Sequence, residues 1–226
     1  MEMSIENINM GDMDWAKYVI RNGRTDQYQE ALDTFSAHAV EENPDAMFCL
    51  GLMYARGQGV QKDSKEGFLW IERAYRKGHR DAAFFLGKMY MNGIGTDRII
   101  HKAESLFKEA ARWNDSRAEL ELGLMYFREE RMRDYNKSAK WFERAATGNN
   151  SEAQFILGQF YKAGVGVERN AVEAVVWLKT AAIGGHKGAQ ILLGNMYRTG
   201  DGVMVNKDES DRWYEMADGK NHNGRK

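Results

Sequence analysis

The chain has 226 residues, which is enough for one or two domains with a hydrophobic core of useful size. Its 32 Lys and Arg residues nearly balance 33 Asp and Glu residues, so the net charge of −1 gives no general attraction to nucleic acids or anionic membranes. The single cysteine, Cys49, excludes an internal disulfide framework and a multi-cysteine metal site.

The first residues of the sequence carry no recognisable targeting signal. The stretch Met1-Glu2-Met3-Ser4-Ile5-Glu6-Asn7 has neither a basic start nor a continuous apolar run, and nowhere do about 18 apolar residues follow one another. We therefore expect no membrane insertion and a cytoplasmic location. A periplasmic location stays open if an export signal once preceded this sequence.

The N-terminal region is predicted to be a flexible segment, residues 1–12, followed by a degenerate helix pair, residues 13–42. Phe35 and Ala39 stand 35 residues before Trp70 and Ala74, which belong to the first regular unit described below. Terminal units of stacked arrays are commonly atypical because one of their faces meets water. We interpret residues 13–42 as an N-terminal cap.

The N-terminal region is also acidic. Residues 1–45 hold ten acidic and three basic side chains, a net charge of −7, whereas the remainder carries +6. Two interpretations stay open: the acidic charge keeps the cap well solvated, or it steers a basic partner towards this end.

The rest of the chain repeats itself with a period of about 36 residues. The pattern Leu-Gly-x-x-Tyr occurs five times, and its glycines are 36, 36, 35 and 36 residues apart. These glycines are Gly51, Gly87, Gly123, Gly158 and Gly194. A period in this range indicates stacked helix pairs, each too small to bury its apolar face alone. The predicted fold class is all-α, a right-handed superhelix, or solenoid, of helix-turn-helix repeats.

The predicted repeats cover about residues 43–78, 79–114, 115–149, 150–185 and 186–218, and residues 219–226 form a C-terminal tail. In each repeat an alanine precedes the helical glycine by five residues, and a glycine-containing turn follows it by six residues in four of the five units. The third unit has Glu129 at the turn and is one residue shorter. The second helix then carries a bulky residue, and these are Trp70, Leu106, Trp141, Trp177 and Trp213. We expect each helical glycine to let this bulky residue press on the backbone.

Several residues predict where the helices begin and end. Side chains suited to capping helix N-termini are Asn43 (before Pro44), Asp63, Asp134, Asn170 and Asn206. Gly78, Asn114 and Gly185 stand where the second helix must stop and reverse, a place that favours a left-handed backbone.

This pattern resembles the Sel-one-like repeat, a relative of the tetratricopeptide repeat. The first unit carries it in Ala46, Leu50-Gly51, Tyr54, Gly57-Gln58-Gly59-Val60, Trp70, Ala74 and Gly78. The resemblance covers about residues 43–218 and implies non-enzymatic scaffolds that bind other proteins, among them immunity partners of secreted bacterial toxins. Some secreted bacterial members carry a disulfide in every unit, and this chain lacks those cysteines.

No group of residues supports catalysis, a cofactor or a metal. The Gly-x-Gly turns follow a helix rather than a strand, which favours a structural turn over a phosphate-binding loop. The histidines His38, His79, His101, His186 and His222 lack metal-ligand spacing. His79 and His186 share one position in the repeat, which favours a role in the repeat register, and Cys49 is expected to be a buried thiol.

The predicted partner-binding surface is the inner face of the first helices. At 100° per residue, the first and fourth residues after each glycine are expected to point away from the fixed positions, towards the concave groove that relatives of this architecture possess. These residues are Leu52 and Ala55, Lys88 and Met91, Leu124 and Phe127, Gln159 and Lys162, and Asn195 and Arg198. The first three pairs are mainly apolar, which favours partner contact; the alternative is that a tightly closed superhelix buries them.

The predicted function is therefore a non-enzymatic scaffold that binds a partner protein or peptide on its concave groove. Two alternatives stay open: an immunity or inhibitor protein that neutralises a secreted bacterial toxin or effector by direct binding, and a self-assembling repeat array. The unshielded last helix favours a further partner or a homodimer through the C-terminal end. No nucleic acid is expected among the partners.

Overall fold

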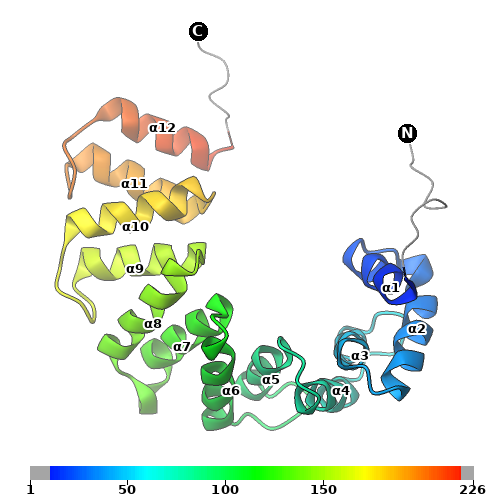
Figure 1. Ribbon diagram of the computed structural model, residues 1–226. Coiled ribbons are helices and arrows are strands. Elements are labelled where there is room, and N and C mark those ends of the chain that lie inside the picture. Colours follow the sequence, from blue (N-terminus) through cyan, green and yellow to red (C-terminus); the bar gives the residue numbers. More distant parts are fainter. Residues whose placement is uncertain (1–10, 220–226) are drawn as a thin grey trace, which may run out of the picture. The chain divides into compact units, whose positions relative to one another are not determined.

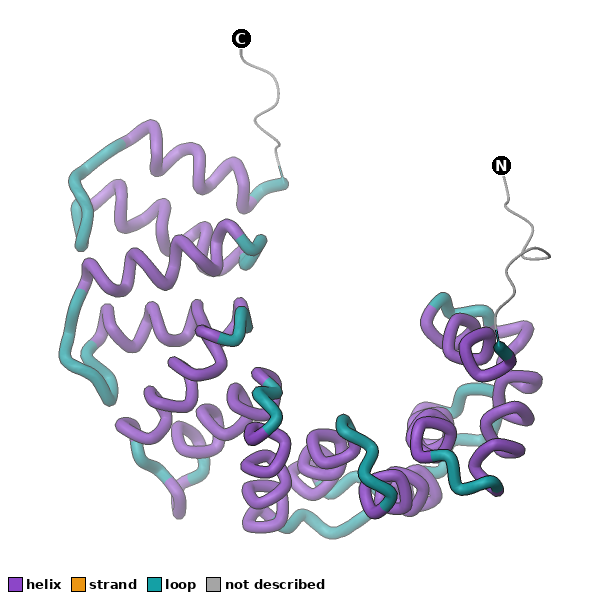
Figure 2. The backbone as a smooth tube through the Cα atoms, viewed as in Figure 1, coloured by secondary structure: helices purple, strands orange, loops and turns teal. Residues whose placement is uncertain are grey.

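The computed structural model describes residues 11–219, and every regular element in this part is a helix (Figures 1 and 2). The predicted C-terminal tail from residue 220 and the first ten residues of the predicted flexible N-terminus lie outside the described residues. The described part of the chain folds into two compact units, divided between Ala110 and Ala111.

The N-terminal unit is a series of helices in which each packs against the next (Figure 1). The elements are α1 (Asp12–Arg21), the short 3₁₀ helix η2 (Thr25–Gln27), α2 (Tyr28–Val40), α3 (Pro44–Arg56), α4 (Ser64–Arg76), α5 (Ala82–Asn92) and most of α6 (Ile100–Arg112). Their shared core includes Phe35, Leu50, Met53 and Ile71. Because α1 and α2 contribute Ala16, Val19 and Phe35 to this core, they cover its N-terminal end.

The C-terminal unit has the same construction. Its elements are α7 (Ser116–Arg128), the 3₁₀ helix η3 (Glu130–Met132), α8 (Tyr135–Thr147), α9 (Ser151–Ala163), α10 (Ala171–Ile183), α11 (Lys187–Thr199) and α12 (Lys207–Ala217). In Figure 1, α9 to α12 are stacked in chain order, each against its neighbour. The predicted all-α class is confirmed for the described residues.

The predicted helix starts and stops are confirmed. The side chains of Asn43, Asp63, Asp134, Asn170 and Asn206 all accept backbone N–H groups of the helices they precede. Gly78, Asn114 and Gly185 have φ angles of 82°, 56° and 86°. Sequence reasoning missed Glu42 and Asn149, which occupy the same position in other units and have φ angles of 62° and 60°. The helix reversal requires a left-handed backbone at this position, which glycine adopts without strain and asparagine more readily than other residues with a side chain.

The helical glycines allow the two helices of one unit to touch, but the touching residue differs from the prediction. A Cβ on Gly51 would lie 2.6 Å from Cγ1 of Ile71, not against Trp70. The corresponding residues in the other units are Phe107, Phe142, Leu178 and Tyr214, each one position after the bulky residue that we predicted. One residue turns a helix by 100°, so Trp70 lies on the flank, where Arg73 stacks on its ring at 4.5 Å.

The Gly-x-Gly turns are structural, as predicted. The second glycine of the turn lies against the backbone carbonyl of the first residue of the preceding unit's second helix, so that a side chain there would overlap the carbonyl. These contacts are Gly59 with Tyr28, Gly95 with Ser64, Gly166 with Tyr135, and Gly202 with Ala171. The third unit has no such glycine and forms the 3₁₀ helix η3 in its turn.

Buried polar side chains also follow the repeat, and sequence reasoning missed them. Gln154 and Gln190 each donate from Nε2 to a carbonyl of the preceding helix, that of Ala146 and that of Ala182, at 3.0 Å. In the third unit the same position is Glu119, which cannot donate when ionised. Arg144 instead donates to the carbonyl of Ala111 at 3.2 Å and pairs with Glu119 at 2.8 Å. Burial raises the pKa of Glu119, and the charge of Arg144 opposes that shift.

Candidate partner-binding face

Of the five residues that directly follow the helical glycines, four are half-buried and one is exposed. Leu52 in α3 and Leu124 in α7 are half-buried and pack against the core clusters of their units. Lys88 and Asn195 are half-buried, and Gln159 is exposed. The residues at this position are therefore neither buried in the core nor uniformly exposed to solvent.

One of the residues at the fourth position, Ala55, lies against the second helix. Ala55 meets the backbone of α4, because a Cβ added to Gly67 would lie 2.9 Å from the Cβ of Ala55. Four residues turn a helix by only 40° beyond a full circle, so this position stays near the glycine that faces the second helix. The carbonyl of Met91 accepts a hydrogen bond from Nε of Arg98 in the following turn at 3.0 Å.

Phe127 forms the exposed apolar part of this face. Its side chain is 37 % exposed, and its ring centroid lies 5.5 Å from that of Phe160 and 5.7 Å from that of Tyr135. Tyr135, the first residue of α8, is itself 43 % exposed. Phe127 and Tyr135, which we call the aromatic pair, thus present two rings in contact to the solvent.

The polar part of the face is held by contacts within the C-terminal unit. Nζ of Lys162 lies 2.6 Å from a carboxylate oxygen of Asp201 in the turn of the next repeat. Oδ1 of Asn195 accepts from Arg198 at 2.8 Å and from the hydroxyl of Tyr214 at 2.9 Å. These side chains therefore link elements within the unit as well as facing outwards.

Two histidines join successive repeats, which confirms their predicted role in the repeat register. His79 stacks on Phe48 of the preceding first helix with ring centroids 4.1 Å apart, and His186 stacks on Phe155 at 4.3 Å. Nε2 of His79 lies 3.5 Å from Asp45, and that of His186 lies 3.1 Å from Glu152. The aromatic residue three positions before the helical glycine is a signal that sequence reasoning did not use.

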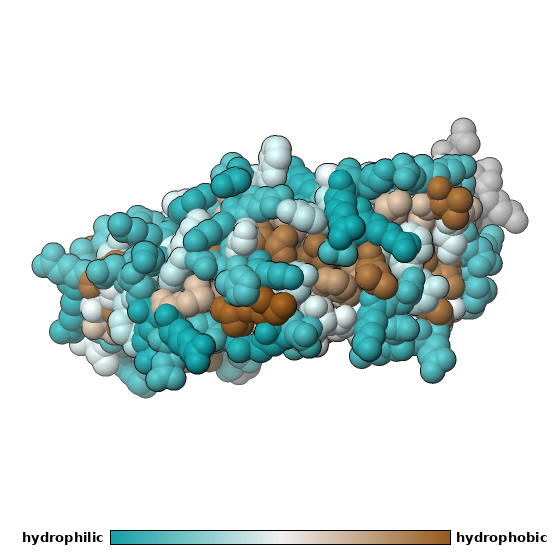
Figure 3. Space-filling model, turned by 90° about the horizontal axis from the view of Figure 1, so that it is seen from below, coloured by the Kyte–Doolittle hydropathy of each residue, from teal (hydrophilic) through white to brown (hydrophobic). Residues whose placement is uncertain are grey.

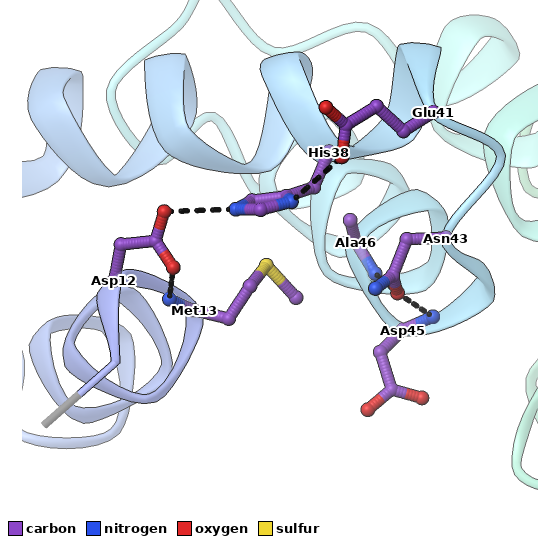
Figure 4. A network of polar contacts seen from close by, with 7 residues as sticks. All are labelled: Asp12, Met13, His38, Glu41, Asn43, Asp45 and Ala46. Atoms are coloured by element: carbon purple, nitrogen blue, oxygen red, sulfur yellow. Dashed lines mark hydrogen bonds and ion pairs between the residues drawn. The ribbon is translucent and has the colours of Figure 1, made fainter.

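A third histidine ties the two capping helices together (Figure 4). Nε2 of His38 in α2 lies 2.9 Å from Asp12, the first residue of α1, and its Nδ1 lies 3.3 Å from Glu41. Both carboxylates favour the charged imidazolium, so they raise the pKa of His38, and the hydrogen bond lowers the pKa of Asp12. Part of the acidic charge in this region is therefore used within the cap.

Two observations on the described residues concern metal binding and thiol chemistry. Among them, no three His, Cys, Asp or Glu side chains are grouped so as to hold a metal ion. Cys49, which we expected to be buried, is half-buried; this burial raises its pKa to about 11, so at neutral pH it is a thiol. Over the face shown in Figure 3, hydrophilic side chains dominate and hydrophobic ones gather in separate areas.

No helix in the described part of the chain is long and apolar enough to cross a lipid bilayer. The helices there have at most 13 residues, whereas a span needs about 20 apolar residues.

Comparison with known proteins agrees with this geometry. A crystal structure of a Sel1 repeat protein from Oxalobacter formigenes superposes with a TM-score of 0.82 at 33 % identity, over 91 % of this chain and 83 % of that one. An immunity protein from Pseudomonas aeruginosa superposes with a TM-score of 0.58 over 97 % of this chain and 84 % of that one, and its 15 % identity shows a shared fold.

The rat protein named DAP3-binding cell death enhancer 1 is 34 % identical over 156 residues, which are 68 % of this chain and 30 % of that protein. This chain thus spans about a third of the length of that relative. The Sel1 repeat family matches residues 44–79, 80–112, 116–150, 151–186 and 188–217. Proteins of this family are typically interaction scaffolds rather than enzymes. The chain therefore belongs to the Sel1 repeat family.

Proposed function

We propose that this chain is a non-catalytic scaffold that binds a segment of another protein through the first helices of its C-terminal unit. The observation that supports this most directly is the exposure of Phe127, 37 %, at a position where its ring is already held by two other aromatic rings. A ring held in this way loses little conformational freedom on binding, which favours affinity.

The aromatic pair has the properties of a binding hot spot. Aromatic side chains carry much of the energy of protein interfaces, because each buries a large area and has few rotatable bonds. Phe127 and Tyr135 are both exposed, although Phe127 also contacts the buried Phe160. A partner that covers the pair would complete an aromatic cluster that begins in the core.

The immunity or inhibitor role is a second candidate for the same face. The fold that this chain shares with the Pseudomonas aeruginosa immunity protein motivates it, and no residue of this chain is assigned a role from that likeness. A toxin or effector gene beside the gene of this chain would favour this candidate. A housekeeping complex that co-purifies with the chain would favour an adaptor.

A further proposal concerns self-association. Self-association through the C-terminal end, as a homodimer or an array, rests on α12, which has no later helix among the described residues to cover it. Sedimentation that depends on concentration without any other protein would support self-association.

The main proposal is tested by affinity capture from the native host with the immobilised chain and its Phe127→Glu variant. We expect the captured partner to be lost with Phe127→Glu and retained with Val40→Glu, a matched control on α2 whose side chain is 81 % exposed. Thermal unfolding of both variants checks that the fold survives. If Phe127→Ala leaves the affinity unchanged but lowers the melting temperature by several degrees, Phe127 is a packing residue and the proposed face is wrong.

A further inference from the structure

The outer face of α10 is apolar where a solvated helix would be polar. Val172, Val176 and Ile183 are 63 %, 52 % and 68 % exposed. With Lys179, which is also exposed, they follow one another at spacings of four, three and four residues. We call these four residues the α10 seam. They form one stripe along the helix, because residues at these spacings lie on the same face.

The repeat itself does not require this stripe. The residues equivalent to Val172 in the other second helices are Lys65, His101, Asn136 and Asp208. Those equivalent to Val176 are Leu69, Ser105, Lys140 and Arg212. Seven of these eight side chains are polar, so α10 departs from its own repeat. A departure towards apolar residues on an exposed helix face marks an interaction site.

The apolar surface continues beyond the N-terminal end of the seam. Gly202 lies against the carbonyl of Ala171, the first residue of α10, and thereby brings the turn before α12 to that end of the helix. The next residues of this turn include Met204 and Val205, which are 90 % and 67 % exposed. A ligand that lies along α10 would therefore also meet these two side chains.

Lys179 supplies the charge that a ligand must match. It lies between Val176 and Ile183 in the seam and makes no ion pair or hydrogen bond within the described part of the chain. Covering the seam with an apolar surface alone would strip water from this ammonium without replacing it, which is costly. A carboxylate placed opposite Lys179 would satisfy it.

We propose that the α10 seam docks an amphipathic helix of another protein, one with apolar side chains at alternating spacings of three and four and an acidic residue facing Lys179. The spacing fits a helix, because side chains at four-three-four intervals interlock with those of a second helix. A second copy of this chain fits less well. Two seams paired about a two-fold axis would bring both Lys179 ammonium groups close to the same stretch of the contact. The seam lies on a second helix, so this proposal does not depend on Phe127.

The test uses a labelled synthetic amphipathic peptide, held helical by a side-chain staple, with leucines along its seam and one glutamate opposite Lys179. Its twin carries lysine in place of that glutamate. We expect the glutamate peptide to bind the full chain on the order of tenfold more tightly than its twin, and this order to reverse with Lys179→Glu. Fluorescence anisotropy measures both affinities.

Three controls keep the outcome interpretable. Val176→Glu should abolish binding of both peptides, and its matched control Leu69→Glu, at the equivalent position of α4, should leave binding unchanged. Phe127→Glu should also leave it unchanged, which separates this proposal from the proposed function above. Circular dichroism confirms that each variant is folded.

The proposal is overturned if both peptides bind equally well to the native chain and to Lys179→Glu, or if Val176→Glu binds as tightly as the native chain. It is also overturned if sedimentation shows that the native chain self-associates and Val176→Glu makes it monomeric. In that case the seam is covered by a second copy.

Discussion

The two histidine joints, one in each unit, have the same parts but are built differently. In both, an imidazole stacks on a phenylalanine of the preceding first helix and lies beside an acidic side chain of that helix. In the C-terminal unit, Nδ1 of His186 also accepts the backbone N–H of Ala189 at 3.0 Å and so caps α11. In the N-terminal unit, Nδ1 of His79 is buried without a partner, and α5 begins only at Ala82.

The difference shows that one residue type at one repeat position can serve two structural purposes. Asn43, Asp115 and Asn150 hold this position in the other repeats, and all three cap their helices. His186 does the same with a ring nitrogen. His79 keeps the stack and the neighbouring carboxylate but does not cap its helix, and burial lowers its pKa. The N-terminal joint therefore depends more on packing, and the C-terminal joint more on hydrogen bonding.

The largest expected difference concerns the phenylalanine of each joint. Phe48 is 8 % exposed and also contacts Phe85 edge-on, so Phe48→Ala should cost roughly 3 to 5 kcal/mol of unfolding free energy. Phe155 is only half-buried, and Phe155→Ala should cost roughly half as much. Urea unfolding followed by circular dichroism measures both. Equal costs would show that the two joints depend on packing to the same degree.

The turns should behave alike in both units, in contrast to the joints. Gly95→Ala and Gly166→Ala would each place a Cβ on a backbone carbonyl at a φ angle of 69° or 65°, at a cost of about 3 kcal/mol. The matched control is Gly78→Ala, which has open space and a φ angle of 82°, and should cost about 1 kcal/mol. Melting temperatures rank the three variants. A Gly95→Ala protein as stable as Gly78→Ala would contradict the close approach.

The helix cap that His186 forms should cause a smaller difference in unfolding stability between the alanine variants of His186 and His79. His186→Ala loses both the stack and the cap, whereas His79→Ala loses the stack and removes a buried ring nitrogen without a partner. We expect His186→Ala to be the more destabilising by about 1 kcal/mol. Urea unfolding midpoints of the two variants test this. A larger loss for His79→Ala would mean that the unpartnered nitrogen is satisfied in solution.

The smallest effect is a difference in pH dependence between two histidines of the N-terminal unit. Burial lowers the pKa of His79, so its contribution to stability is present above the ordinary value of 6.5 and is lost as the pH falls below it. The pKa of His38 is raised, so its contribution is present below 6.5 and is lost as the pH rises through its folded pKa.

Urea unfolding midpoints across this pH range should therefore lose their acid-side decline in His79→Asn and their alkaline-side decline in His38→Gln. NMR titration of the two ring protons gives the same signs directly. If both rings titrate in the same direction relative to 6.5, the assignment of burial to one and carboxylate pairing to the other is wrong.

Much of the fold could be predicted from the sequence because the residues that begin, end and pack the helices recur at equivalent positions in five repeats. The cap at Asp63, the left-handed residue Gly78 and the close helix contact at Gly51 all follow from local backbone rules. The prediction failed by one residue for the side chain that meets Gly51. Both Trp70 and Ile71 are large and apolar, and only the rotation of α4 against α3 selects Ile71.

The candidate site could be predicted only in part. The row that begins with Leu52 and Leu124 follows from helical periodicity, but its burial depends on neighbouring repeats. Lys162 was predicted to face a partner, and it pairs with Asp201 in the turn of the next repeat. The α10 seam was missed because the apolar residues of α10 surround the helix, and periodicity alone does not tell a buried side from an exposed one.

The sequence by itself therefore determined the repeat, its helix boundaries and the membership of the Sel1 repeat family. These depend on contacts between residues that are near in the chain or that recur at a fixed interval. Tertiary structure decided which of several equivalent side chains are covered and which are exposed. It left the ring of Phe127 and the α10 seam exposed, and it left Nδ1 of His79 buried without a hydrogen-bond partner. The physical reason is that exposure depends on the separation and rotation of packed helices, which differ by small amounts that no local pattern records.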